Sequence, residues 1–351
     1  MTRPRKRLVF NKYVLIITVI FAMYYIFEVY LYKVSKYNFN KLECVDGNKC
    51  LRILLVADPQ LIGLQNEIIH PLTGLAIFDS DWYLLKTYNI AFDFVNPHVV
   101  IFLGDLFDEG STATQKEFDT YKARFHGIYG HSTEFIKHVY LPGDNDIGGE
   151  GYDIVTKEKV IRFYNAFHQT NTFSIKMVNF YKYNILTRSF IEPIQDNESN
   201  KINVGLSHIP LLKKSGGYEL EMLKSTKPHV IFSAHDHFAS IIDMKHNGND
   251  KNTLKIIPKE NKIFRYPLSD LNTYEFIVPT VSYRMGTDKI GHGYAIIEGE
   301  NISYTVLWSP VRFPTLIFYG VLLFITGFYS MIVVCKIYIK KRPRKHLLLP
   351  I

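Results

Sequence analysis

The chain has 351 residues, 47% of them hydrophobic and 15% aromatic, which allows a large core and membrane segments besides. Its formal net charge of +8 comes from its ends, because residues 1–12 and 336–351 hold 11 of the 41 basic residues and no acidic one. The 30 basic and 33 acidic residues that remain leave a net charge of −3 between them. The charge therefore gives no basis for nucleic-acid binding, and we expect no nucleic-acid partner.

Two apolar segments, residues 13–32 and 313–335, are long enough to cross a bilayer as helices. The first is too long for the apolar core of a signal peptide and precedes no small-residue cleavage pattern, and the second ends abruptly in a polybasic tail. Basic residues flank the outer end of both segments, so the positive-inside tendency predicts two cytosolic tails and a luminal interval. The expected parts are a tail, a transmembrane helix, a linker, a luminal domain, a second transmembrane helix and a tail: residues 1–12, 13–32, 33–50, 51–312, 313–335 and 336–351.

The expected luminal interval contains two Asn-X-Ser sequons, at Asn197 and Asn301, as glycosylation in a lumen requires. Cys44 and Cys50 lie outside both apolar segments, and they could pair if that side is oxidising. Spacing alone does not decide whether this disulfide forms.

Between the apolar segments, short apolar runs bounded by turn residues predict strands, and apolar residues at helical spacing predict helices. Asp79 and Asp81 stand just before the first such helix and are expected to cap its N-terminus. A polar stretch at 243–272 is expected to be a surface excursion. The strands are expected at 51–57, 99–103, 135–141, 202–206, 230–232, 275–281 and 293–298, the helices at 82–95, 117–129 and 160–167, and a hairpin at 173–190.

Five of these strands end in a metal-ligating side chain. The pattern is clearest in VVIFLGDLFDEG at 99–110, where a fully apolar run breaks into Gly104-Asp105 and Asp108 follows. Such a run predicts a strand buried on both faces, and a carboxylate at its end needs a cation, a metal or a neutral state. Alone, this pattern also fits a helix N-cap or a turn. The residues at the five strand ends are Asp58, Asp105, Asp144, His208 and the pair His235 and His237.

Carboxylates and imidazoles together suit Mn, Fe or Zn better than Mg or Ca, which prefer oxygen alone. The ends of parallel strands meet at one edge of a sheet, so we expect these side chains to gather there. Two ions sharing one carboxylate need about this number of ligands, and such a pair acts on phosphate esters.

In this order the motifs resemble those of the calcineurin-like metallophosphoesterases, an α/β family with two β-sheets flanked by helices. More narrowly, VADPQ, FLGDLFDEG, PGDNDIGGE, SHIPL, SAHDH and VPTVSYRMG between two apolar spans resemble the membrane-anchored metallophosphoesterase 1 group. The resemblance covers residues 52–298 and both spans. It implies a four-layer α/β/β/α sandwich with one transmembrane helix at each end.

Carried over to this sequence, the resemblance implies two divalent metal ions, with Mn²⁺ the expected one. Asp58 and His237 would bind one ion and Asp105 would bridge both, while the second ion would take Asp144, His208 and His235. Asp108 and Asp146 match positions that orient the ligands without binding metal.

The chain departs from the family pattern at three positions. Gln60 stands where the wider family has His, so it is a weak ligand at best. Asp144 replaces a usual Asn ligand, and Asn145 replaces a His that acts on the leaving group; Asn cannot transfer a proton. An alternative alignment makes Asn145 itself the ligand. Arg284, in SYRMG, is a candidate phosphate contact, although a structural role fits it equally well.

The group that the chain resembles removes ethanolamine phosphate from a mannose of GPI anchors early in the secretory pathway. We therefore expect a phosphodiesterase in the membrane of the endoplasmic reticulum, the ER–Golgi intermediate compartment or the Golgi, with GPI-anchored proteins as substrate. One alternative is a catalytically weakened relative that binds GPI-anchored cargo or glycan. Another is the same chemistry on a different phosphate ester.

Overall fold

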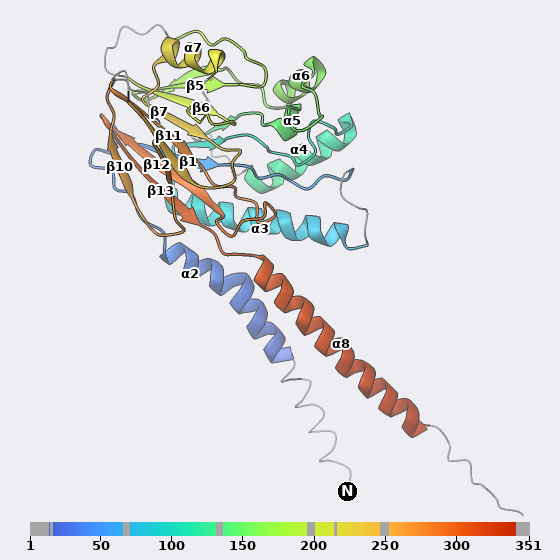
Figure 1. Ribbon diagram of the computed structural model, residues 1–351. Helices are drawn as coiled ribbons and strands as arrows, with labels where there is room; N and C mark the ends of the chain where they lie inside the picture. The colour runs from blue at the N-terminus through green and yellow to red at the C-terminus, as the bar shows by residue number, and fades with distance from the viewer. Residues whose placement is uncertain are drawn as a thin grey trace, which may run out of the picture. The chain divides into compact units, whose positions relative to one another are not determined.

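The computed structural model describes residues 14, 17–65, 71–130, 136–194, 201–213, 216–245 and 253–341. The chain divides into two compact units, Met1–Pro310 and Val311–Ile351, and each is described by itself. The first unit contains both sheets (Figure 1). The second contains one long helix, α8 (Phe313–Lys341).

The first sheet has six strands in the order β10-β13-β12-β1-β2-β3. Its strands β1, β2 and β3 run parallel, and β12, β13 and β10 continue the sheet antiparallel on the other side of β1. Their bounds are β1 (Leu51–Val56), β2 (Val99–Phe102), β3 (Lys137–Tyr140), β10 (Phe264–Pro267), β12 (Gly291–Glu298) and β13 (Asn301–Trp308).

The second sheet has seven strands in the order β4-β5-β6-β7-β11-β8-β9. The consecutive strands β5, β6, β7 and β11 are parallel, and β8 pairs antiparallel with β11. The bounds are β4 (Thr172–Ile175), β5 (Val178–Tyr183), β6 (Ile202–Ser207), β7 (Val230–Ser233), β8 (Ser240–Lys245), β9 (Thr253–Ile256) and β11 (Asn272–Ile277).

The core follows from the alternation of side chains along buried strands. In β1, Ile53 and Leu55 pack between the two sheets, while Leu54 and Val56 pack against the helices on the outer face. Those outer helices are α3 (Thr73–Val95) and α4 (Gln115–Tyr129). On the outer face of the second sheet, α7 (Gly217–Thr226) packs on β5 and β7 (Figure 1). The four layers confirm the predicted α/β/β/α sandwich.

The predicted start of the first helix was wrong. The structure begins α3 at Thr73, nine residues before the predicted start at 82, so Asp79 and Asp81 lie inside it and cap nothing. Asp79 instead accepts a hydrogen bond from the Tyr283 hydroxyl at 2.9 Å, and Asp81 pairs with Arg124 at 2.8 Å. Both carboxylates therefore make tertiary contacts instead of capping the helix.

Several other elements also differ from the sequence prediction. The stretch 243–272 is only partly a surface excursion, because it contains the end of β8, the exposed strand β9 and the edge strand β10. Strand β13 was not predicted, although it pairs with β12 along its whole length. The remaining helices of the first unit are η1 (Ile26–Tyr30, π-helical), α2 (Leu31–Tyr37), α5 (Asp144–Ile147) and α6 (Lys157–Ala166).

Among the described residues, two helices are long and apolar enough to cross a membrane, at Ile17–Tyr37 and Phe313–Lys336. In the most apolar stretch of each helix, at most 11% of the residues are buried, whereas a core helix of a water-soluble domain would be mostly buried. They fit the predicted helix at each end. The structure also joins Cys44 and Cys50 in a disulfide, the pairing that spacing had left open.

Candidate metal centre

The structure gathers the strand-end residues into one buried group. Ligand atoms of Asp58, Asp105 and His208 lie within 4.8 Å of one another, and so do those of Asp144, His208 and His235. Each follows the carboxyl end of a parallel strand: β1, β2, β3, β6 or β7. The two groups meet at His208, whose Nε2 lies 2.8 Å from Asp144 and 3.4 Å from Asp105.

Two glycines allow the loops to come this close. A Cβ at Gly104 would lie 2.5 Å from His208 Nδ1, and a Cβ at Gly143 would overlap Asp105 and reach 2.8 Å from its Cγ. Gly104 also has a φ of 103°, which L side chains rarely adopt. The glycines of GD and PGD therefore serve the packing of the site.

The backbone is strained where the candidate ligands attach. Five residues at the site have positive φ: Asp58 (49°), Gln60 (42°), Asp105 (51°), His235 (67°) and His237 (61°). Each such residue costs on the order of 1–3 kcal/mol and persists only where its surroundings hold it. Here the Gln60 N–H donates to Asp105 O at 2.9 Å, which ties two of these turns together. Strain of this kind concentrates at functional sites.

His208 is held in one orientation. Its Nδ1–H donates to Leu103 O at 2.9 Å, which leaves Nε2 directed at the carboxylates of Asp144 and Asp105. Burial alone would lower the pKa of His208, but the charges of Asp105, Asp144 and Asp58 outweigh burial and raise it to about 10. A backbone carbonyl on one ring nitrogen is the usual way to present the other nitrogen to a metal.

The carboxylates of the site lie close together in a buried environment. Burial and the neighbouring charge of Asp105 raise the pKa of Asp58 to about 7, and burial raises that of Asp105 to about 6. Asp58 Oδ2 is buried with no hydrogen-bond partner among the described residues. Burial would also raise the pKa of Asp144, but hydrogen bonds from His208 and His235 lower it. Buried oxygen and nitrogen donors with an unpartnered oxygen among them fit a divalent metal pair.

His237 and Gln60 lie beside Asp105. The Gln60 side-chain nitrogen is 3.0 Å from Asp105 Oδ2 and 3.3 Å from His237 Nε2. Burial lowers the pKa of His237, which keeps its ring neutral, as a metal ligand must be. A carboxamide can also turn its oxygen to the same point.

The geometry distinguishes Asp144 from Asn145. Asp144 Oδ1 faces both imidazoles, at 2.8 Å from His208 and 3.2 Å from His235. Asn145 turns the other way: its N–H and side-chain amide donate to the two oxygens of Asp105, at 3.0 and 3.1 Å. This arrangement supports the alignment in which Asp144, rather than Asn145, stands at the ligand position.

Asp146 and Asp108 act on the surroundings of the site. The fully buried Asp146 accepts hydrogen bonds from the backbone N–H groups of Leu106, Phe107 and Gly143, and so joins the loops after β2 and β3. Asp108 pairs with Arg284 at 3.1 Å, and the same guanidinium reaches Gln60 O at 3.4 Å. Arg284 is thus held at the edge of the cluster.

Sequence reasoning missed two supporting residues. The Thr280 hydroxyl donates to Asp58 O at 3.0 Å, and the buried Glu275 accepts from the N–H groups of Leu211 and Leu212, just after His208. A lone acid inside an apolar strand was a usable signal for Glu275, whereas nothing local marks Thr280. Of the two sequons, Asn301 is exposed at the start of β13, and Asn197 lies outside the described residues.

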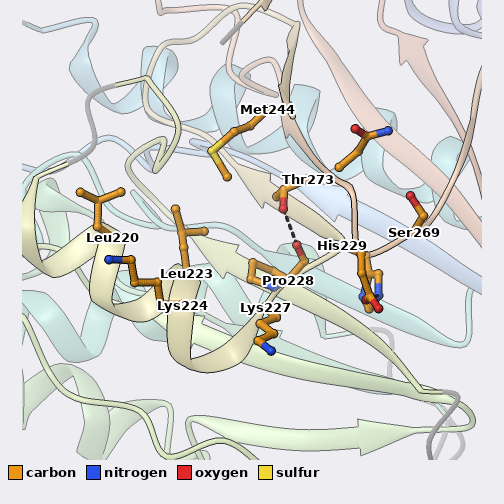
Figure 2. A pocket seen from close by; sticks show the side chains of 11 residues that line it. Leu220, Leu223, Lys224, Lys227, Pro228, His229, Met244, Ser269 and Thr273 are labelled. Atoms are coloured by element: carbon orange, nitrogen blue, oxygen red, sulfur yellow. Dashed lines mark hydrogen bonds and ion pairs between the residues drawn. The ribbon is translucent and has the colours of Figure 1, made fainter. Parts of the chain in front are cut away.

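A separate cavity of about 430 Å³ lies between α7 and the segments around His229 and Thr273 (Figure 2). It adjoins the amino end of β7, whereas His235 and His237 follow its carboxyl end. The cavity therefore shares no residue with the cluster.

The chain matches the model of the calcineurin-like phosphoesterase family over residues 51–239, more than half of its length. The chain therefore belongs to the calcineurin-like phosphoesterases, which confirms the family that its motifs predicted.

Within this family the chain is similar to proteins named Metallophosphoesterase 1. It is 28% identical to that of Danio rerio over 262 residues, which cover 72% of this chain and 60% of that protein. It is 30% identical to that of Cricetulus griseus, over 48% of this chain and 41% of that protein. The Caenorhabditis elegans homolog is 22% identical over 84% of this chain and 82% of its own length.

The chain thus aligns with 60% or less of these two vertebrate relatives. Among solved structures, purple acid phosphatase from yellow lupin (Lupinus luteus) overlaps 74% of this chain and 52% of its own, with 10% identity and a TM-score of 0.44. That likeness is too low to bear on function.

Proposed function

We propose that this chain is a dinuclear-metal phosphodiesterase that removes ethanolamine phosphate from a mannose of GPI anchors. The observation that carries the proposal is the pair of overlapping carboxylate and imidazole groups that meet at His208. The substrate follows from the resemblance to the membrane-anchored metallophosphoesterase 1 group; the relatives' names specify a phosphoesterase and no substrate.

In this proposal the side chains divide between two ions, expected to be Mn²⁺. Asp58 and His237 would hold one ion, with Gln60 a weak ligand at best. Asp144, His208 and His235 would hold the other, and Asp105 would bridge the two. When bound, such a pair polarises the phosphoryl oxygens and supplies hydroxide from water at neutral pH.

The chain's own residues orient the substrate and limit proton transfer. Arg284, which pairs with Asp108, would contact a phosphate oxygen with its guanidinium. Asn145 occupies the position of the family's leaving-group histidine, and its amide is directed at Asp105. Because an amide transfers no proton, we expect a leaving group that departs with help from elsewhere.

We further propose that residues 1–12 and 336–351 are cytosolic and that 33–312 faces the lumen of the early secretory pathway. The polybasic flanks of both apolar helices, the Cys44–Cys50 disulfide and the exposed sequon at Asn301 support this topology. GPI-anchored proteins in the same membrane would then be the substrate.

The experiment is hydrolysis by the purified full-length chain with Mn²⁺ against a panel of phosphodiesters, including an ethanolamine-phosphate mannoside. We expect turnover of diesters and its loss in Asp105→Asn. A wild type that binds metal but cleaves no ester would favour a second candidate, a weakened relative that binds GPI-anchored cargo or glycan, for which Asn145 is the reason. Turnover of another ester alone would refute the assigned substrate and keep the chemistry.

A further inference from the structure

The first half of α3 has an exposed apolar face. The exposed fractions of Leu75, Phe78 and Trp82 are 62%, 63% and 39%. Their spacing of three and four residues puts them on one side of the helix. The opposite side is buried and carries Ser80, Leu84 and Thr87. The Phe78 and Trp82 rings stack with centroids 6.3 Å apart. Apolar side chains aligned in this way usually mark a contact surface.

This face continues directly into a contact with the first apolar helix. Lys86 lies one turn beyond Trp82 on the same side of α3 and pairs with Glu28 at 2.6 Å. Its Nζ also lies over the Tyr32 ring at 4.8 Å and the Trp82 ring at 5.1 Å. Glu28 is only 7% exposed and sits in the π-helical turn within the candidate membrane segment Ile17–Tyr37. The exposed face therefore starts where this segment meets the domain.

We propose that Leu75, Phe78 and Trp82 form a membrane-contact face that lies in the lipid interface of the bilayer entered by the first apolar helix. Continuity with that helix selects the bilayer as the occupant, since the Glu28–Lys86 pair fixes α3 beside it. Tryptophan favours the interface of a bilayer, and a helix with one apolar face lies along it rather than across it.

The membrane-contact face also connects to the metal centre. Asp79, on the same half of α3, accepts a hydrogen bond from Tyr283, the neighbour of Arg284 in sequence. Arg284 in turn pairs with Asp108. Lipid contact by α3 thus holds the edge of the site at the membrane, which would favour a substrate embedded in the bilayer; this consequence rests on the proposed function.

The two tryptophans of the chain allow a direct test. Trp308 is 7% exposed, and its Nε1 donates to Glu260 O, so it is shielded. Full-length protein would be placed in phosphatidylcholine vesicles whose acyl chains carry bromine, a quencher of tryptophan fluorescence. In Trp308→Phe, which keeps Trp82, we expect strong quenching by bromine near the headgroup and weaker quenching by bromine near the chain end.

The matched control is Trp82→Phe, in which the remaining Trp308 should keep its fluorescence in both lipids. If Trp308→Phe does not fold, the quenching of wild type and its loss in Trp82→Phe give the same information. Trp82 fluorescence that is equal in brominated and ordinary lipid would overturn the proposal, because the face would then be covered by protein or exposed to water.

A second experiment separates this face from the proposed function. Leu75→Glu should lower cleavage of a vesicle-embedded phosphodiester several-fold and leave cleavage of a soluble one unchanged. Leu271→Glu, at an exposed leucine away from α3, should change neither. Equal losses on both substrates in Leu75→Glu would overturn the link to the site. A wild type that cleaves neither would refute the proposed function, while the quenching result still decides the membrane-contact face.

Discussion

Replacing Gly143 with alanine should disable the metal centre without unfolding the domain. A Cβ there would overlap the Asp105 carboxylate and its backbone N–H and would come within 2.8 Å of Asp105 Cγ, where ordinary contacts begin at 3.4 Å. The φ of Gly143 is −103°, so alanine adds no backbone strain and the effect is purely steric. The loops after β2 and β3 must therefore separate, by on the order of 1 Å.

A misplacement of this size commonly lowers a rate roughly 10²-fold. The assay is steady-state hydrolysis of an activated phosphodiester by the full-length chain, with bound metal measured on the same sample and folding checked by circular dichroism. Gly127→Ala is the control, because nothing lies within 4 Å of its Cβ and alanine favours the α4 helix by roughly 0.5–1 kcal/mol. A folded Gly143→Ala with wild-type rate and metal content would refute the steric argument.

Three further predictions concern single side chains. Asp108→Asn should release Arg284 and raise KM more than it lowers kcat, by roughly 10-fold; an unchanged KM would show that Arg284 does not contact the substrate. Asn145→His should accelerate cleavage of alkyl diesters more than of nitrophenyl ones, because it restores a general acid; equal changes would place the acid elsewhere. Burial lowers the pKa of His292 from its ordinary 6.5 to about 3, so the unfolded chain binds a proton that the folded chain does not. The stability that this group contributes is full above pH 6.5 and is lost as the pH falls toward 3. The free energy of unfolding, measured with urea, should therefore fall less between pH 7 and 4.5 in His292→Gln than in wild type; the same fall in both proteins would contradict this.

The sequence alone could predict the strand ends because the signal there is local. A short apolar run that breaks into Asp or His is readable without any knowledge of its neighbours, and parallel strands bring such ends together. The same rule predicted the buried strands, whereas the arrangement of two sheets was implied by the resemblance to the family. The glycines of the loops were visible as well, but their close approach to Asp105 and His208 was not.

What the sequence did not reveal depends on contacts between distant segments. Helix α3 begins at Thr73 without a side-chain capping bond from Leu72, and Asp79 and Asp81 lie inside it, bound to Tyr283 and Arg124. Thr280 reaches Asp58 across more than two hundred residues, and the Arg284–Asp108 pair joins two loops in the same way. Such pairings have no periodicity that a pattern could detect.

Strand β13 was missed for a different reason. Its polar residues Ser303 and Thr305 interrupt the apolar run, yet Thr305 is fully buried and donates to Lys262 O. A buried, hydrogen-bonded hydroxyl is indistinguishable from an exposed one in the sequence, so the alternation was obscured.

The most direct test of the central claim is the metal content of the purified full-length chain and of three variants. We predict about two divalent ions in wild type, about one in Asp58→Asn and about one in Asp144→Asn, because each carboxylate serves one ion. Asp105→Asn should lose both, since in the proposed site Asp105 would bridge them. Full occupancy in Asp105→Asn, or one ion or none in wild type, would contradict the dinuclear centre.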